Sequence, residues 1–537
     1  MTPDPQLSRR SLLAGSLAGA GLLGLSRVAR GQGAERRGGT LVVAADTEPR
    51  NLNPAIVASN GVFFVASKVI EPLAEMAYGG DGLTPRLATA WEGSPDGRSV
   101  RFTLREGVTW HDGKPFTAAD VAFSALQVWK PLQNLGRVVF KDLEAVDTPD
   151  ARTAILRFSA PTPFQLVRNA LPALTAVVPK HLYEGTDIGA NPANTKLVGT
   201  GPFRFVEHRP GEFYRLERNQ NYWEPNRPLL DGIVFRVLPD RGAVATALEA
   251  NEIRLSAFSA VPLADLDRIG TVPGIKVIPG GYEGITYQLT VEINHRRKEL
   301  ADPRVRKAVA HAIDRRFVVD TIFLGYAAPS TGPIPRFDKQ FYAADVAEPA
   351  FDPKRANALL DEAGYARGAN GARFQLRLLP APWFEQTRQF GDYLRQALRA
   401  VGIDALIVNN DAAAHTRAVY TERAFDLAVG SPVYRNDPAI STTILYQGGL
   451  PPGVPFSNQY GYDSPAMNEI IGRAAVAIDP AERVRLYHDF QKRAAEDLPL
   501  IHVAEFTFTT VARDSVQNVA NNPRWATSHW ADTWLSA

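Results

Sequence analysis

Residues that could act in catalysis or hold a metal are scattered along the 537-residue chain and form none of the familiar motifs. There is no phosphate-binding G-x-x-x-x-G-K-[ST] loop, no H-E-x-x-H zinc motif, and no G-x-S-x-G or S-x-x-K serine motif. The chain has nine histidines and no cysteine, which excludes thiol catalysis, Cys-ligated zinc, iron–sulfur clusters and disulfides. The sequence therefore predicts no catalytic residue, no metal site and no cofactor.

One histidine has an acidic neighbour that could work with it as an acid–base pair. His111 and Asp112 lie in residues 110–114, where Asp-Gly is a strong turn signal after a predicted strand. We interpret this pair as part of a turn. The glycines of residues 19–24 match G-x-G-x-x-G, but no strand precedes them, so a dinucleotide site is not predicted.

Composition and charge indicate an ordinary globular protein of more than one domain. The chain is 45% hydrophobic and 22% charged, which provides apolar material for several cores. Its 59 Lys and Arg residues against 57 Asp and Glu residues leave a net charge of +2. Because nucleic-acid binders normally carry a basic face or tail, this balance argues against a nucleic-acid partner.

The first 31 residues predict an export signal. Arg9 and Arg10 precede an apolar, glycine-rich run over residues 11–25, which resembles a twin-arginine (Tat) signal. The run has 15 residues, fewer than the roughly 20 that span a bilayer as a helix. Ala29 and Gly31 fit a cleavage site after residue 31. We predict a periplasmic protein that is not a lipoprotein, because the chain lacks cysteine.

Hydrophobic periodicity predicts strands and helices in alternation. Residues 39–45 form a short apolar run typical of a buried strand, and residues 99–105 alternate as a half-buried strand does. Thr117 and Asp120 match a capping box at the start of a helix. Further on, Asp352 and Pro353 begin a helix that Gly364 ends.

A β-α-β unit follows in the second half of the chain. A strand over residues 374–379 leads into a helix with apolar residues from Phe390 to Val401, stopped at Gly402 and followed by a strand over residues 403–408. Such a unit implies a parallel sheet with a right-handed crossover. Ligands of open parallel sheets usually bind beyond the carboxyl ends of the strands, so the loops there are the first place to look for a site.

Several segments together resemble one family, the extracellular solute-binding proteins that serve dipeptide, oligopeptide and nickel ABC importers. The most specific of them is Trp110-His111-Asp112-Gly113 within the long match over residues 102–121. The other matching segments are residues 85–91, 199–203, 216–223, 302–315 and 352–365. Where the family often has Gly-Glu-x-Asp, this chain has residues 251–254 as Asn-Glu-Ile-Arg. The resemblance covers most of the mature chain.

This resemblance implies an α/β, two-lobed periplasmic binding protein fold of type II-like organisation, with mixed sheets and a hinge between the lobes. Lobe one is expected at residues 32–282 plus 503–537, with an extra subdomain at about 60–195, and lobe two at residues 283–502. The chain should cross between lobes near residues 282–294 and 500–506. The implied role is that of a carrier and not of an enzyme.

The partners implied by the resemblance are a small-molecule or peptide ligand, and an ABC permease with its ATPase in the inner membrane. No nucleic-acid partner is expected, and the protein is expected to be a monomer. An exported hydrolase using a carboxylate pair is the alternative from another class, although nothing singles out such a pair among the 57 acids. A chaperone-like or sensory binder without its own transporter is a further alternative.

Two positions depart from the dipeptide-binding members of the family. Those members place an arginine for the peptide carboxylate in the loop after the strand at residues 374–379, where this chain has Trp383. They also place an aspartate for the peptide amine shortly before an Asp-Pro pair, where this chain has Tyr434. Both replacements argue against a simple dipeptide. Flat aromatic faces would suit sugar rings, aromatic groups or long peptides held mainly by backbone hydrogen bonds, so a sugar or another ring-bearing solute is the alternative to a peptide. Packing of both rings inside lobe two is the other interpretation.

Four more residues complete the predicted ligand site. Arg435 and Asp437 follow Tyr434 and offer charged contacts to the solute. Ser59 and Asn60 align with a ligand loop of lobe one in the family. The predicted ligand set therefore consists of Ser59, Asn60, Trp383, Tyr434, Arg435 and Asp437.

Overall fold

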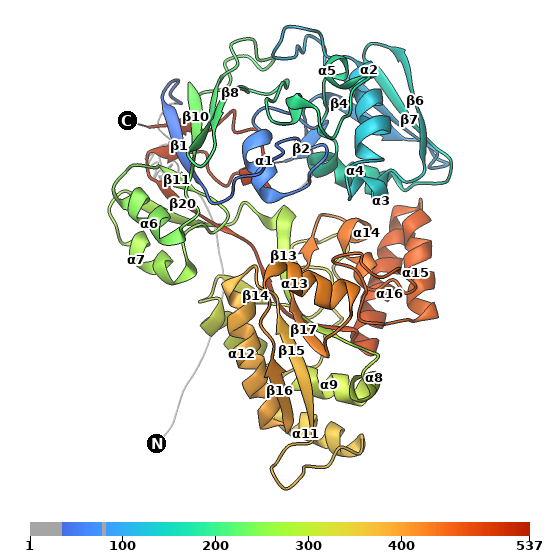
Figure 1. The fold of residues 1–537 in the computed structure, drawn as a ribbon. Helices are drawn as coiled ribbons and strands as arrows, with labels where there is room; N and C mark the ends of the chain where they lie inside the picture. The colour runs from blue at the N-terminus through green and yellow to red at the C-terminus, as the bar shows by residue number, and fades with distance from the viewer. Residues whose placement is uncertain (1–34, 78–81, 537) are drawn as a thin grey trace, which may run out of the picture. The chain divides into compact units, whose positions relative to one another are not determined.

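The computed structural model describes residues 35–77 and 82–536, so the predicted signal peptide at residues 1–31 lies outside the described residues. Within the described residues the chain forms two seven-stranded mixed sheets, one four-stranded antiparallel sheet and two short two-stranded ribbons (Figure 1). No helix of this part of the chain combines the length and the apolar character needed to cross a membrane.

The first seven-stranded sheet has β1 near its centre, as the apolar run at residues 39–45 predicts. Strand β1 pairs in parallel with β10 on one side and β11 on the other, which accounts for its almost continuous apolar sequence. The sheet order is β12 (Ile275–Pro279), β20 (Thr509–Arg513), β11 (Leu255–Ser256), β1 (Thr40–Ala45), β10 (Gly232–Val237), β9 (Phe213–Arg218) and β8 (Phe203–Arg209). Its last strand to be synthesised, β20, is inserted between two earlier strands.

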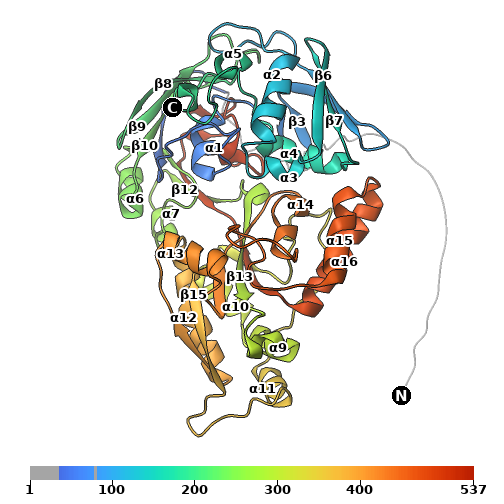
Figure 2. The same ribbon diagram turned by 45° about the vertical axis from the view of Figure 1, so that its right-hand side comes forward.

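The four-stranded sheet carries the two sequence signals at residues 99–120. Its order is β4 (Ala88–Gly93), β5 (Ser99–Leu104), β7 (Thr153–Phe158) and β6 (Leu143–Asp150). The alternation in β5 is confirmed, because Val100, Phe102 and Leu104 are buried and Arg101 is exposed. Helix α2 (Ala118–Phe123) packs on β6 and β7 (Figure 2). Its predicted capping box is also confirmed, since the Thr117 N–H donates to Asp120 Oδ2 at 2.9 Å.

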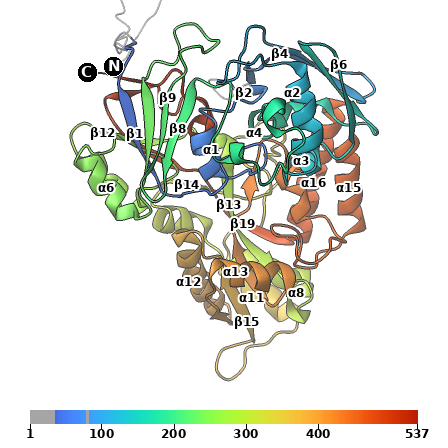
Figure 3. The same cartoon turned by 45° about the horizontal axis from the view of Figure 1, so that its top comes forward.

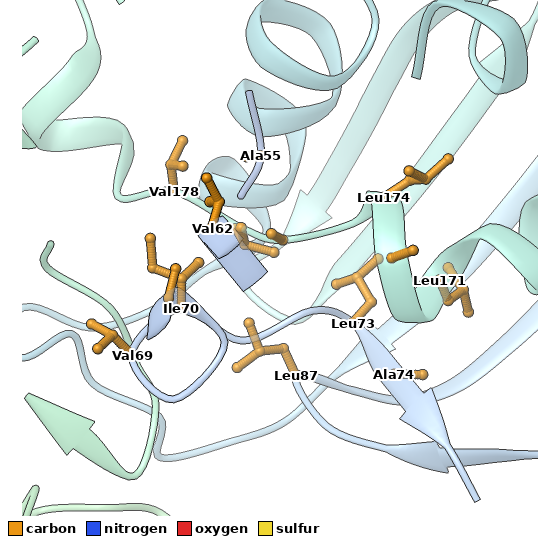
Figure 4. Close-up of a cluster of buried hydrophobic side chains, with 14 of the residues drawn as sticks. Ala55, Val62, Val69, Ile70, Leu73, Ala74, Leu87, Leu171, Leu174 and Val178 are labelled. Carbon is orange, nitrogen blue, oxygen red and sulfur yellow. The ribbon is translucent and has the colours of Figure 1, made fainter. Parts of the chain in front are cut away.

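One hydrophobic core joins the first sheet to the four-stranded sheet. Figure 4 shows Val62, Leu73 and Leu87 meeting Leu171, which comes from a later segment of the chain, in this core. The C-terminal tail packs into it as well, because Trp525 and Trp530 are buried and stack with ring centroids 4.7 Å apart.

The second seven-stranded sheet is built around β13 and β15. Its order is β14 (Ala327–Pro329), β19 (Leu500–Phe506), β13 (Thr286–Ile293), β17 (Leu427–Gly430), β15 (Phe374–Pro380) and β16 (Ile403–Ile407), with β18 (Val433–Tyr434) also paired to β13. The predicted β-α-β unit is confirmed, because β15 and β16 are parallel neighbours and α12 (Glu385–Ala400) packs on both (Figure 1). Helix α11 (Pro353–Glu362) begins and ends as predicted, with the Asp352 carboxylate accepting from the Arg355 N–H and Gly364 at φ +86°.

The remaining helices cover these sheets (Figures 2 and 3). Those that accompany the first and four-stranded sheets are α1 (Asn60–Ala66), α3 (Gly136–Val139), α4 (Phe164–Leu174), α5 (Lys180–Tyr183), α6 (Arg241–Glu249) and α7 (Leu266–Gly270). Those of the second sheet are α8 (Lys298–Ala301), α9 (Pro303–His311), α10 (Arg315–Phe317), α13 (Ala412–Thr416), α14 (Pro438–Ser441), α15 (Pro465–Val476) and α16 (Pro480–Asp497).

The chain crosses between the two seven-stranded sheets twice within the described range. Strand β12 belongs to the first sheet and β13 to the second, and β19 belongs to the second sheet while β20 returns to the first. Two connecting segments therefore join two bodies. We call lobe one the parts of the chain that build the first and four-stranded sheets, and lobe two the part that builds the second sheet.

Candidate functional site

Strand β18 and the loop that joins it to α14 carry three of the predicted ligand residues, with Tyr434 ending the strand and Arg435 and Asp437 in the loop. Asn436 adopts the left-handed conformation at φ +61°, which turns the chain sharply after the strand. Asp437 then caps α14, with its Oδ1 accepting from the Ala439 N–H at 3.0 Å, and Pro438 takes the first helical position. The Asn-Asp-Pro sequence thus sets the turn that follows Tyr434 and Arg435.

Asp437 is engaged by partners from both lobes. Its two oxygens accept from Arg483 Nη1 and Nη2 at 2.8 and 2.7 Å, in the bidentate arrangement of a strong ion pair. Oδ2 also accepts from Asn169 Nδ2 of lobe one at 3.1 Å. Asp437 is fully buried, and its ion pair with Arg483 balances its charge there. It therefore offers no free charge to a ligand. What it provides directly is a contact between the lobes.

Tyr434 lies in the interior of lobe two. It is 1% exposed, and its hydroxyl donates to Asp338 Oδ2. Burial raises the pKa of Asp338 to about 6, although the hydrogen bond from Tyr434 acts in the opposite direction. The ring packs edge-on against Phe337. This environment matches the interpretation in which the Tyr434 ring fills the core of its lobe.

Trp383 lies, as predicted, in the loop that follows β15. Its indole Nε1 donates to Ser431 Oγ at 2.9 Å, and its ring meets His415 and Phe456 edge-on at 5.0 and 5.9 Å. Trp383 is half-buried, so part of the residue stays accessible. A ligand-binding role for Trp383 stays a prediction.

Ser59 and Asn60 begin α1 in lobe one. Ser59 is the capping residue, and its Oγ accepts from the Val62 N–H at 3.4 Å. Asn60 Nδ2 donates to the Tyr287 hydroxyl of β13 at 3.3 Å. Asn60 therefore contacts lobe two, whereas Ser59 serves the helix itself.

Arg435 differs from its neighbours because its guanidinium has no hydrogen-bond or ion-pair partner among the described residues. It is half-buried, and no hydrogen bond or ion pair joins its guanidinium to any residue within the described ranges. Burial lowers its pKa, and the nearby Tyr287 hydroxyl opposes this only in part. Burial also raises the pKa of Tyr287, so that this hydroxyl is uncharged at neutral pH.

Contacts from lobe one complete the surroundings of Arg435. Arg524 is 3% exposed and donates through Nη1 to the Gly284 carbonyl at 3.0 Å. Burial and then the charge of Arg435 lower the pKa of Arg524 to about 9. Met76 Sδ accepts from Asn436 Nδ2 at 3.4 Å. Of the predicted residues, Asn60, Arg435 and Asp437 are thus brought to the region where the lobes meet.

Sequence reasoning missed Asn169, Met76 and Arg524, which belong to lobe one. They lie far from the second-lobe motif in sequence, and no periodicity or spacing marks them. The Asn-Asp-Pro turn signal was available for Asn436, whose side-chain Oδ1 is buried and has no partner among the described residues.

A cavity of about 610 Å³ opens beside these contacts. Both lobes line it, and its walls include Met76, Arg168, Asn169, Asp338, Asn436 and Asn522. The volume lies in the range of about 300–1,000 Å³ that is typical of small-molecule sites. The cavity can therefore hold a solute of a few residues or rings in contact with both lobes.

The residues that could suggest catalysis have structural roles. The Nδ1 of His111 accepts from the Gly199 N–H at 3.3 Å, and its Nε2 is 2.9 Å from the Gly201 carbonyl, so the ring ties two matching family segments together. Asp112 Oδ2 is 2.6 Å from His181 Nε2. Within residues 35–77 and 82–536 no group of three or more metal-ligating side chains could hold a metal ion.

Two sheets on separate lobes, two connecting segments and a cavity shared by both lobes define the class of two-lobed solute-binding proteins. The model of the bacterial extracellular solute-binding proteins, family 5, matches residues 82–450, and the chain belongs to this family. The substrate-binding protein CtaP of Listeria monocytogenes has the same fold, with a TM-score of 0.81 at 23% identity, covering 94% of this chain and all of that one.

Curated relatives span most of the chain. The dipeptide-binding protein of Escherichia coli is 25% identical over 524 residues, which cover 93% of this chain and 96% of the relative. The glutathione-binding protein GsiB of Pectobacterium atrosepticum is 27% identical over 433 residues, covering 78% of this chain and 79% of the relative. The predicted family and fold class are both confirmed, and the family is a substrate-binding family of transport proteins.

Proposed function

We propose that this protein captures a peptide or peptide-like solute between its two lobes in the periplasm and delivers it to the permease of an ABC importer. The cavity of about 610 Å³, lined by both lobes, is the observation that carries this proposal. Membership in the solute-binding family supports it, as does the similarity to a dipeptide-binding and a glutathione-binding protein.

Capture depends on a hinge motion of the lobes. The connecting segments between β12 and β13 and between β19 and β20 are short, so a few residues can absorb the rotation that opens the cavity. Closure brings Asn60 to Tyr287 and Asn169 to Asp437 and removes water from around the solute. The closed shape can then be recognised by the permease.

The proposed domain division is a lobe one of residues 32–282 plus a C-terminal segment, with an extra subdomain at about 60–195, and a lobe two between them. Strand β13 at the first crossing supports the boundary after residue 282. Since β19 runs to Phe506 within the second sheet, we propose the second crossing at residues 507–508 instead of 503.

Export and partnership complete the proposal. Arg9 and Arg10 support export through the twin-arginine route, and replacing both by lysine should keep the protein in the cytoplasm. The partners are an ABC permease and its ATPase, and the protein acts as a monomer. The hypothesis of a ring-bearing solute gains little support from Tyr434, because this residue is 1% exposed and its ring is not available to stack on a ligand.

Isothermal titration calorimetry with dipeptides, tripeptides and glutathione tests this function. We expect binding at a 1:1 ratio, and the solute recovered after denaturation should be chemically unchanged. A hydrolase would return cleaved products, and a protein that binds none of these solutes would contradict the proposed ligand class.

A further inference from the structure

The loop between β18 and α14 holds a cation that lacks a counter-charge. Asp437, two residues after Arg435, is occupied by both Nη atoms of Arg483. Throughout the part of the chain that the structure describes, no carboxylate pairs with Arg435. Arg435 is half-buried, and a guanidinium that loses part of its hydration without gaining an anion is disfavoured, so the position favours a partner that the described residues do not supply.

A second guanidinium approaches the same place from lobe one. Arg524 is buried, has one Nη atom on the Gly284 carbonyl, and lies with its guanidinium carbon 5.9 Å from the centre of the Phe63 ring. Burial first, and then the like charge of Arg435, lower the pKa of Arg524, while the Glu75 carboxylate opposes this in part. Neither cation can therefore neutralise the other.

Strand pairing and contacts around Met76 bring the backbone of Arg435 close to Arg524, because Thr286 pairs with Tyr434 and Arg524 binds the Gly284 carbonyl. Asn436 Nδ2 reaches Met76 Sδ at 3.4 Å. A Cβ atom on Gly284 would lie 2.6 Å from Arg524 Cγ and 2.9 Å from Met76 Sδ, so a larger residue there would displace one of these side chains. The adjacent Asn436 Oδ1 is buried and unpartnered among the described residues. This region thus offers guanidinium donors beside one amide acceptor.

We propose that Arg435, Arg524 and Asn436 form an anion subsite that takes a carboxylate of the solute, while a neighbouring N–H of the solute donates to Asn436 Oδ1. This proposal rests on the proposed function, because it names the chemistry of the solute held between the lobes. A planar guanidinium matches a carboxylate through parallel N–H···O bonds. The terminal residue of a peptide, or an N-acyl amino acid, carries both groups.

Amidation of the ligand tests the subsite in the mature protein. The probes are an equimolar mixture of tripeptides with free C-terminal carboxylates and the same mixture with C-terminal amides, measured by thermal shift and calorimetry. We expect the wild type to bind the carboxylates at least about 30-fold more tightly than the amides. Arg435→Gln should weaken carboxylate binding by a similar factor and leave amide binding unchanged. The control is Arg395→Gln, an exposed arginine of α12.

The anion subsite would be overturned if Arg435→Gln weakened the binding of both tripeptide mixtures equally, or if it weakened the binding of neither. Without ligand, Arg435→Gln should melt at the same temperature as the wild type or higher, because it removes a half-buried charge that has no counter-charge among the described residues. A melting temperature several degrees lower would assign Arg435 to the fold and would also overturn the proposal.

A separate measurement distinguishes failure of the anion subsite from failure of the proposed peptide-binding function. If neither tripeptide mixture binds the wild type, the proposed ligand class fails, and acetate then tests the subsite alone. At constant ionic strength with chloride, acetate should raise the melting temperature of the wild type more than that of Arg435→Gln and Arg524→Gln. An identical response of all three proteins would overturn the anion subsite.

Discussion

At the scale of single residues, burial decides which charged groups remain available to a ligand. Asp437 and Arg483 neutralise each other in the interior, whereas Arg435 has no such partner in the described part of the chain. The sequence alone identifies both Arg435 and Asp437 as polar residues near a turn. It cannot tell them apart, because the pairing with Arg483 depends on how α16 packs against the loop.

Glu292 allows a residue-scale prediction on stability. It lies on β13, is 3% exposed, and burial raises its pKa to about 8 from an ordinary value of 4.5. Since the folded pKa is the higher one, the folded protein binds the proton more tightly. The stability that the protonated Glu292 contributes to the folded state is fully present below pH 4.5, and this contribution is lost as the pH rises toward 8.

Glu292→Gln should therefore be more stable than the wild type at pH 8. The difference should grow from pH 5 to pH 8 by at most about 1.4 kcal/mol per pH unit and then level off. Urea unfolding at a series of pH values measures this difference. Glu469→Gln, at an exposed glutamate of α15, is the control and should show no such trend. A pH-independent difference for Glu292→Gln would contradict a buried, protonated carboxyl.

At the scale of elements, local signals predicted the structure well where a segment carries its own start and end. The capping box at Thr117, the Asp352–Pro353 helix start and the β-α-β unit all depend on neighbours in sequence, and all three are present. The insertion of β20 between β12 and β11 was not predictable in this way, because that pairing joins residues from opposite ends of the chain.

Two helical glycines provide an element-scale prediction. A Cβ on Gly391 of α12 would lie 2.5 Å from Pro380 Cγ at the end of β15, whereas nothing lies within 4 Å of one on the exposed Gly472 of α15. Gly472→Ala should stabilise the protein by about 0.5–1 kcal/mol, because alanine loses less backbone entropy in a helix. Gly391→Ala should destabilise it by about 1–3 kcal/mol, because the rigid proline ring cannot move aside.

Denaturant unfolding of both variants checks these opposite signs. Each glycine is the matched control of the other, since the same substitution is made inside a helix of lobe two. If Gly391→Ala stabilised the protein as much as Gly472→Ala, this result would contradict the close contact between α12 and the end of β15.

At the scale of the whole molecule, family membership was predictable and the chemistry of the site was only partly so. Long motifs such as residues 102–121 identify the family, because they build turns and contacts specific to this fold, as His111 does with Gly199 and Gly201. The arrangement around Arg435 and Arg524 was not predictable, since it exists only where the two lobes meet.

Native mass spectrometry of the mature protein, incubated with a tripeptide mixture or a periplasmic extract, tests the central claim most directly. Denaturation of the complex releases the bound molecule for identification. The account predicts one solute per protein, chemically unmodified and carrying at least one carboxylate. A protein that stays empty in both incubations, or that releases a chemically converted molecule, would contradict the solute-binding account.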